Sequence, residues 1–150
     1  MADIVRIQHQ VPLIGQPNDV TCWMAAANML LNRRATLGAA RTEADGTLAE
    51  GDNNIREFAR ANGFRMYYGQ SWTAQGLIAL LRKGPAGMFG RMPDLHAIVI
   101  TGLESDGTEA GTYLTIHDPR PVGQGTLWRN YPYVDFMQDY PASTNYMLQR

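Results

Sequence analysis

The only cysteine of this 150-residue chain, Cys22, stands where a nucleophilic thiol is expected. It opens an apolar, helix-forming stretch, and the partial positive charge at a helix N-terminus favours the thiolate, which is the nucleophilic form of cysteine. Gln16 lies six residues earlier, and Trp23 follows Cys22 directly. The Gln16 amide and the backbone N–H of Cys22 are suitable donors for an oxyanion. This pattern predicts acyl-transfer chemistry at a thiol.

A thiol nucleophile needs a base nearby and a group that orients the base. His96 opens an apolar strand, and Asp118 ends the next strand along the chain. Side chains alternate along a strand, so Leu114, Ile116 and Asp118 share one face. If the two apolar residues face the core, Asp118 lies beside the neighbouring strand, where it can accept the second ring N–H of His96.

Each of these residues also has a purely structural interpretation. A lone cysteine in an apolar helix is usually a small core residue, and His96 among apolar neighbours is compatible with a buried core histidine. Asp118 precedes Pro119, and Asp-Pro is an ordinary turn signal. His117 is the rival base, but the strand alternation turns it away from the face of Asp118.

Composition narrows the classes of function. The chain is 45% apolar and 18% charged with a net charge of −1, and its arginines are scattered, so we expect no nucleic-acid partner. One cysteine excludes an internal disulfide. A metal site from Cys22, His96 and His117 or Asp118 lacks the local ligand pairs of zinc sites, and the glycines form no nucleotide-binding loop. We therefore expect no cofactor and no metal.

The elements that position these residues divide the chain into a helical part followed by strands. We also expect an extended N-terminal segment of about 15 residues and a loop over 35–52. The stretch 128–137 fits either a loop or a short helix. We expect helices over 22–34, 52–60 and from a cap at Ser71 or Thr73 to Leu81, and strands over 64–68, 86–90, 95–103, 113–117 and 144–148. Helices followed by a mostly antiparallel sheet predict a single α+β domain over residues 1–150.

The N-terminal segment contains an early acidic residue, Asp3, and no long apolar run, so it is not a secretory signal peptide. The apolar stretches elsewhere are too short to cross a bilayer, and we expect no membrane partner. Synthesis in a cytoplasm is the expectation. Export by a specialised secretion system that reads no cleavable signal remains open.

The chain resembles the papain-like cysteine peptidases of clan CA in three features. These are the element Gln-(five residues)-Cys-Trp, a late histidine that opens an apolar strand, and an aspartate that ends the next strand. The segment 12–26 is most similar to small bacterial effector-type cysteine proteases, and the peptidases that trim double-glycine leaders are another near variant. The resemblance covers about residues 10–120. It implies a helical N-terminal half, with the nucleophile helix packed on a C-terminal antiparallel sheet.

By the same resemblance Cys22 is the nucleophile, His96 the base, Asp118 the orienting residue and Gln16 the oxyanion donor. The chain departs from papain in two respects: it is much shorter, so substrate subsites do not carry over, and its third member is Asp where papain has Asn. Many small relatives also use Asp.

The first functional hypothesis is a cysteine peptidase that hydrolyses protein or peptide substrates. The segment before Gln16 is too short for the usual inhibitory pro-domain, which favours narrow specificity, activation by a host factor, or delivery elsewhere as an exported effector or toxin. The second hypothesis keeps the thiol chemistry in a peptidoglycan amidase or another acyl transferase. The third is a catalytically inactive peptidase fold that serves as a binding module.

Overall fold

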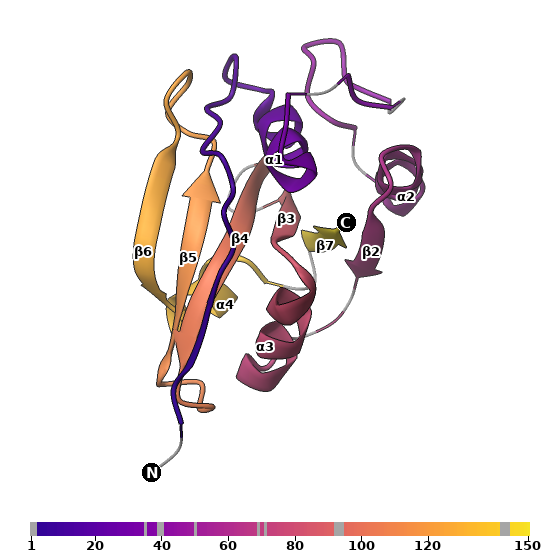
Figure 1. Ribbon diagram of the computed structural model, residues 1–150. Coiled ribbons are helices and arrows are strands. Elements are labelled where there is room, and N and C mark those ends of the chain that lie inside the picture. Colours follow the sequence, from indigo (N-terminus) through magenta and orange to yellow (C-terminus); the bar gives the residue numbers. More distant parts are fainter. Residues whose placement is uncertain are drawn as a thin grey trace.

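The computed structural model describes residues 3–34, 36–38, 41–49, 51–68, 70, 72–91, 95–141 and 145–150. Four helices and seven strands follow one another along this part of the chain (Figure 1). In chain order they are β1 (Val5–Gln8), α1 (Cys22–Leu31), α2 (Asp52–Ala61), β2 (Arg65–Tyr68), α3 (Ala74–Lys83), β3 (Ala86–Arg91), β4 (Leu95–Ser105), β5 (Thr112–Asp118), β6 (Thr126–Pro132), α4 (Tyr133–Asp139) and β7 (Asn145–Gln149).

The strands form one sheet in the order β2-β7-β3-β4-β5-β6, and β1 pairs with β4. All of these pairings are antiparallel. β4 is the central strand: β3 lies along its first half, and β1 continues along the same side of its second half, next to Gly102 to Ser105. The predicted α+β class with an antiparallel sheet is therefore confirmed.

The strands place apolar side chains on both faces of the sheet, and helices cover both faces. On one face, α1 and α2 pack through Ala26 and Phe58 against Phe89 and Val99. On the other face, α3 and α4 pack against a second cluster. Its fully buried members include Leu77, Leu81, Ile98, Ile100, Leu114, Ile116, Phe136 and Met147.

Helix α1 begins at Cys22 as predicted but ends at Leu31, three residues before the expected Arg34. Asn32 adopts the left-handed conformation, with φ of 60°. The backbone N–H groups of Asn32 and Arg33 then bond to the carbonyls of Met29 and Asn28, which closes the helix. Asparagine tolerates this conformation better than most residues, and Asn32 therefore ends the helix. The prediction of a longer helix rested on the composition of the stretch and overlooked this residue.

The stretch 128–137, for which the sequence left a loop or a short helix open, contains the end of β6 and most of α4. The extended entry contains β1, whose partner in β4 lies about a hundred residues away in sequence. Thr73 caps α3 by accepting the N–H of Gly76. The alternative cap at Ser71 and the first residue of the predicted 144–148 strand lie outside the described residues. None of the described helices has the length and apolarity required to cross a membrane.

Candidate active site

Cys22 is the first residue of α1 and is 6% exposed. The helix packs closely on the sheet because the turn after Cys22 carries the small residues Ala25, Ala26 and Ala27, all nearly inaccessible. Thr21 is the N-cap of α1, but its side chain makes no cap bond to the N–H groups of the first turn. The Thr21 hydroxyl donates instead to the Asn18 side-chain oxygen. The first turn therefore keeps donors that are available to an anion.

Gln16 is fixed by backbone bonds to the loop that follows β5. Its N–H donates to the carbonyl of Pro119, and its carbonyl accepts the N–H of Gly123, both at 2.9 Å. The side chain is 1% exposed, and its Nε2 donates to the Asn18 carbonyl at 2.7 Å. An amide nitrogen carries two hydrogens, so one Gln16 donor is left after this bond.

Gly15 makes this anchoring possible. A Cβ at this position would lie 2.3 Å from the backbone nitrogen of Gln124 and 2.4 Å from the carbonyl carbon of Gly123. Backbone atoms cannot move aside as a flexible side chain can, so only glycine lets the two segments approach this closely. The contact holds the segment before Gln16 against the loop after Asp118.

His96 and Asp118 form a direct pair. The Nε2 atom of His96 lies 2.7 Å from Oδ1 of Asp118, and their side chains are 6% and 16% exposed. The same Oδ1 accepts the backbone N–H of Arg120 at 3.0 Å. Leu114 and Ile116, on the same face of β5, are buried as the strand alternation requires.

The second ring nitrogen of His96, Nδ1, is buried and has no hydrogen-bond partner among the described residues. The Cys22 thiol is nevertheless near enough to affect the imidazole. Burial lowers the pKa of His96, but hydrogen bonding to Asp118 and to Cys22, together with the electrostatic interaction with each of them, raises it above its ordinary value of 6.5. The Cys22 side chain is therefore close to the His96 ring.

The carboxylate shows the complementary shift. Burial raises the pKa of Asp118, yet hydrogen bonds from His96 and the Arg120 backbone, the charge of His96 and a bond from the Trp128 side chain together lower it below its ordinary value of 3.8. The pair therefore keeps Asp118 anionic and makes the His96 ring a better proton acceptor than a free imidazole.

A loop over residues 41–49 lies beside the start of α1. The Trp23 indole N–H donates to the Gly46 carbonyl at 3.2 Å. The buried side chain of Asn54 bonds the N–H and carbonyl of Arg41 and the carbonyl of Ala49. Asn54 thus fixes the base of this loop, and Trp23 fixes its tip next to Cys22.

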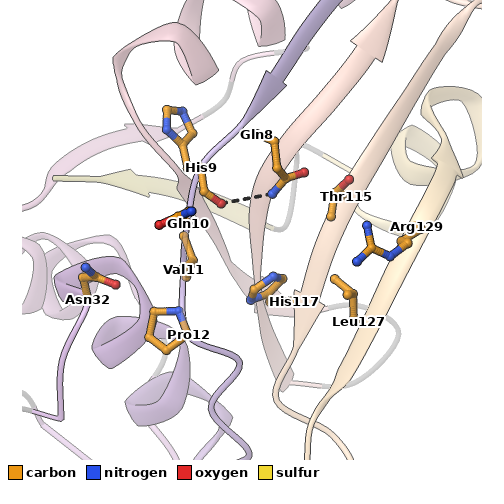
Figure 2. A pocket seen from close by; sticks show the side chains of 10 residues that line it. All are labelled: Gln8, His9, Gln10, Val11, Pro12, Asn32, Thr115, His117, Leu127 and Arg129. Atoms are coloured by element: carbon orange, nitrogen blue, oxygen red, sulfur yellow. Dashed lines mark hydrogen bonds between the residues drawn. The ribbon is translucent and has the colours of Figure 1, made fainter.

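The rival base, His117, does not join this group. It lies on the other face of β5, opposite Val99, and lines a cavity with the segment 8–12 and with β6 (Figure 2). The structure therefore brings Asp118 to His96 and takes His117 away from both, as the strand alternation predicts.

Two contacts to Asp118 were not predicted from the sequence: the backbone N–H of Arg120 and the side chain of Trp128. Trp128 lies on the edge strand β6 and is 47% exposed. An Asp-Pro-Arg turn that folds back on its own aspartate is a local signal for the first contact. The second depends on how β6 pairs with β5, which has no local signal.

No cluster of three or more His, Cys, Asp or Glu side chains suited to a metal ion occurs in the described part of the chain. The arrangement around Cys22 is instead that of a thiol beside an imidazole–carboxylate pair at the N-terminus of a buried helix, packed on an antiparallel sheet. This combination of fold and site defines a class of thiol hydrolases with a papain-like arrangement.

Comparison with family models gives the same class. Residues 5–127 match the family described as papain-like cysteine protease AvrRpt2. The matched segment contains Gln16, Cys22, His96 and Asp118 and extends over most of the 150 residues. The chain belongs to this family of papain-like cysteine proteases. A comparison with curated proteins gave no match.

Proposed function

We propose that the protein is a cysteine peptidase in which Cys22 is the nucleophile, His96 the general base and acid, and Asp118 the orienting residue. Gln16 and the backbone N–H of Cys22 form the oxyanion hole. The observation that carries this proposal is the hydrogen bond between His96 Nε2 and Asp118 Oδ1, which leaves the buried Nδ1 without a hydrogen-bond partner in the described part of the chain and able to take a proton.

The chemistry follows from this geometry. Nδ1 of His96 takes the thiol proton, and the sulfur attacks the carbonyl carbon of the scissile peptide. The carbonyl oxygen becomes an anion that accepts the free Gln16 donor and the Cys22 N–H. The protonated His96 then gives its proton to the leaving nitrogen as the C–N bond breaks, which leaves a thioester.

In the second half of the reaction, His96 takes a proton from water, and the resulting hydroxide attacks the thioester carbon. The C–S bond breaks, a carboxylic acid product leaves, and the proton held by His96 returns to the sulfur. Asp118 remains ionised throughout and holds the Nε2–H tautomer, which its lowered pKa favours.

The decisive experiment is labelling with an epoxide inhibitor selective for papain-like thiolates, read by intact mass. We expect one adduct per wild-type chain, loss of the adduct in His96→Ala and its retention in His117→Ala. The His117 variant is a matched control because both histidines are buried but only His96 lies beside Cys22. A wild-type thiol that reacts only after denaturation would contradict the proposal and favour the inactive binding module.

The substrate class that we propose is protein or peptide with narrow specificity. The test compares casein, a peptide library and purified peptidoglycan stem peptides. Cleavage of a restricted set of peptides supports the proposal, whereas turnover of stem peptides alone would identify the amidase alternative. Cys22→Ala, which removes only the sulfur, is the negative control for each substrate.

We also propose that the protein acts after delivery to another cell, where a host factor activates it. The support is the similarity of the segment 12–26 to small bacterial effector-type cysteine proteases. A translocation reporter fused to the chain tests delivery. Peptidase activity that appears only after addition of host lysate tests the activating factor.

A further inference from the structure

A cavity of about 490 Å³ lies on the face of β5 opposite to Asp118 (Figure 2). The β5 residues Thr115 and His117 line it from the sheet. The segment 8–12 crosses beside them on one side, and Leu127 and Arg129 of β6 lie on the other. Cavities of this size hold small molecules. This one takes no part in the proposed peptidase chemistry.

His117 is the feature of this cavity that requires a partner. It is 7% exposed, and its Nδ1 is buried with no hydrogen-bond partner in the described part of the chain. A buried polar atom left unsatisfied costs about 1–3 kcal/mol, so a ligand that bonds Nδ1 recovers this cost. Figure 2 shows the imidazole between the segment 8–12 and β6, within the cavity.

The charges around His117 indicate the kind of ligand. The cavity lining contains one cationic side chain, Arg129, and none of its residues is a carboxylate. His9 also lines it, but its Nε2 bonds the Leu81 carbonyl. Asp118, the next residue along β5, lies on the other face and is bonded to His96. Burial lowers the pKa of His117, bonding to the Pro12 backbone raises it, and the charge of Arg129 lowers it again, with a net decrease. Without a ligand the imidazole is therefore held neutral next to an arginine.

An anion reverses this balance. A negative group next to Arg129 and His117 removes the repulsion between the two cations and favours the protonated imidazole. His117 then takes one proton from solvent at Nδ1 and becomes a donor to the ligand. The amides of Gln8, Gln10 and Asn32 line the same cavity and supply neutral polar groups.

We propose that this cavity is a second binding site, for a small molecule with an anionic oxygen group, held by Arg129 and by a protonated His117. The site is separate from the peptidase centre. Its lining includes the segment 8–12, which leads to Gln16, and Asn32, which lies at the end of the helix that begins with Cys22. Because the site exists only in the folded chain, a bound anion stabilises the folded state by mass action.

The test follows the histidine ring signals of the wild-type protein by NMR while sodium sulfate or sodium succinate is added, with sodium chloride at matched ionic strength as reference. We expect a saturable shift at His117 with either probe or with both, and a rise in the pKa of His117 when the probe is bound. Above the pKa of free His117, affinity for sulfate falls about tenfold per pH unit, since binding takes up one proton. Binding of sulfate alone identifies a tetrahedral oxyanion site, and binding of succinate alone identifies a carboxylate site.

Arg129→Gln should weaken binding by about tenfold or more, because it removes the charged donor. Arg65→Gln is the matched control, since Arg65 is an exposed arginine on β2 that does not line the cavity. His117→Gln should abolish the pH dependence while the fold persists, which the amide spectrum verifies. Equal shifts in sodium chloride, unchanged affinity in Arg129→Gln or an unchanged pKa of His117 would each overturn the proposal. No arm depends on turnover, so its failure is distinct from a failure of the peptidase assignment.

Discussion

His117 and Asp118 are consecutive residues of β5, yet their side chains lie on opposite faces of the sheet. Asp118 bonds the ring of His96 at 2.7 Å, and His117 lines a cavity on the other side. The alternation of side chains along a strand produces this separation. It assigns the two buried histidines to different environments, and the pKa of His96 is raised while that of His117 is lowered.

The first prediction concerns the pH profile of Asp118→Asn. An asparagine oxygen can still accept the His96 and Arg120 N–H groups that now bond Oδ1, so the ring stays oriented. Without the negative charge of Asp118, the pKa of His96 is lower. The protonated His96, which the leaving amine needs as its acid, is therefore lost at a lower pH. We therefore expect the basic limb of kcat/KM to move to lower pH, measured from about pH 5 to about pH 9.

Asp118→Ala is the companion variant. It removes both the charge and the acceptor, so we expect kcat/KM to fall by about 10²–10⁴ at every pH. A basic limb that stays in place in Asp118→Asn would show that Asp118 does not control His96.

The second prediction tests the oxyanion donor. Gln16→Ala removes the amide that retains one free N–H, and we expect kcat to fall by about 10²–10³ with little change in KM. Epoxide labelling of Cys22 should persist, since the His96–Asp118 pair is untouched. Gln124→Ala, in the exposed loop that packs on Gly15, is the matched control and should keep full kcat. Equal losses in the two variants would contradict a specific role for Gln16.

The third prediction uses the close approach at Gly15. A Cβ there would meet the Gln124 and Gly123 backbone at less than 3 Å, so Gly15→Ala must separate the two segments. We expect a loss of about 1–3 kcal/mol in the free energy of unfolding, together with lower kcat from the displaced Gln16. Gly76→Ala in α3 is the control, because its tightest contact is the Thr73 hydroxyl at 3.2 Å, and it should leave kcat unchanged. Urea titration and steady-state kinetics measure the two effects separately.

The parts of the site that could be predicted from the sequence depend on local rules. Cys22 opens a helix because an apolar, alanine-rich stretch begins there, and Asp118 reaches His96 because strand alternation places it on the buried face. The parts that could not be predicted depend on pairing between distant segments. β1 pairs with β4, and β6 brings Trp128 to Asp118, through registers that no short motif encodes.

The cavity at His117 shows the same limit. Alternation predicts that His117 leaves the face of Asp118, but its surroundings depend on where the segment 8–12 crosses the sheet. That path is set by the bond from the His9 N–H to the Thr101 carbonyl and by the backbone bonds of Gln16, all of them long-range. Sequence reasoning could therefore reject His117 as the base without finding what it lines.

The last prediction is that the two histidines affect stability in opposite directions with pH. The raised pKa of His96 means that its contribution to stability is complete below pH 6.5 and is lost as pH rises through the folded-state pKa. The lowered pKa of His117 means that its contribution is present above pH 6.5 and is lost as pH falls through the folded-state pKa. Urea unfolding of wild type, His96→Gln and His117→Gln is measured at pH values on both sides of 6.5. The difference between wild type and each variant in the free energy of unfolding gives the contribution of that histidine. The His96 difference should shrink toward high pH and the His117 difference toward low pH. Two differences with the same slope would mean that the two rings share one environment, contrary to their separation by the sheet.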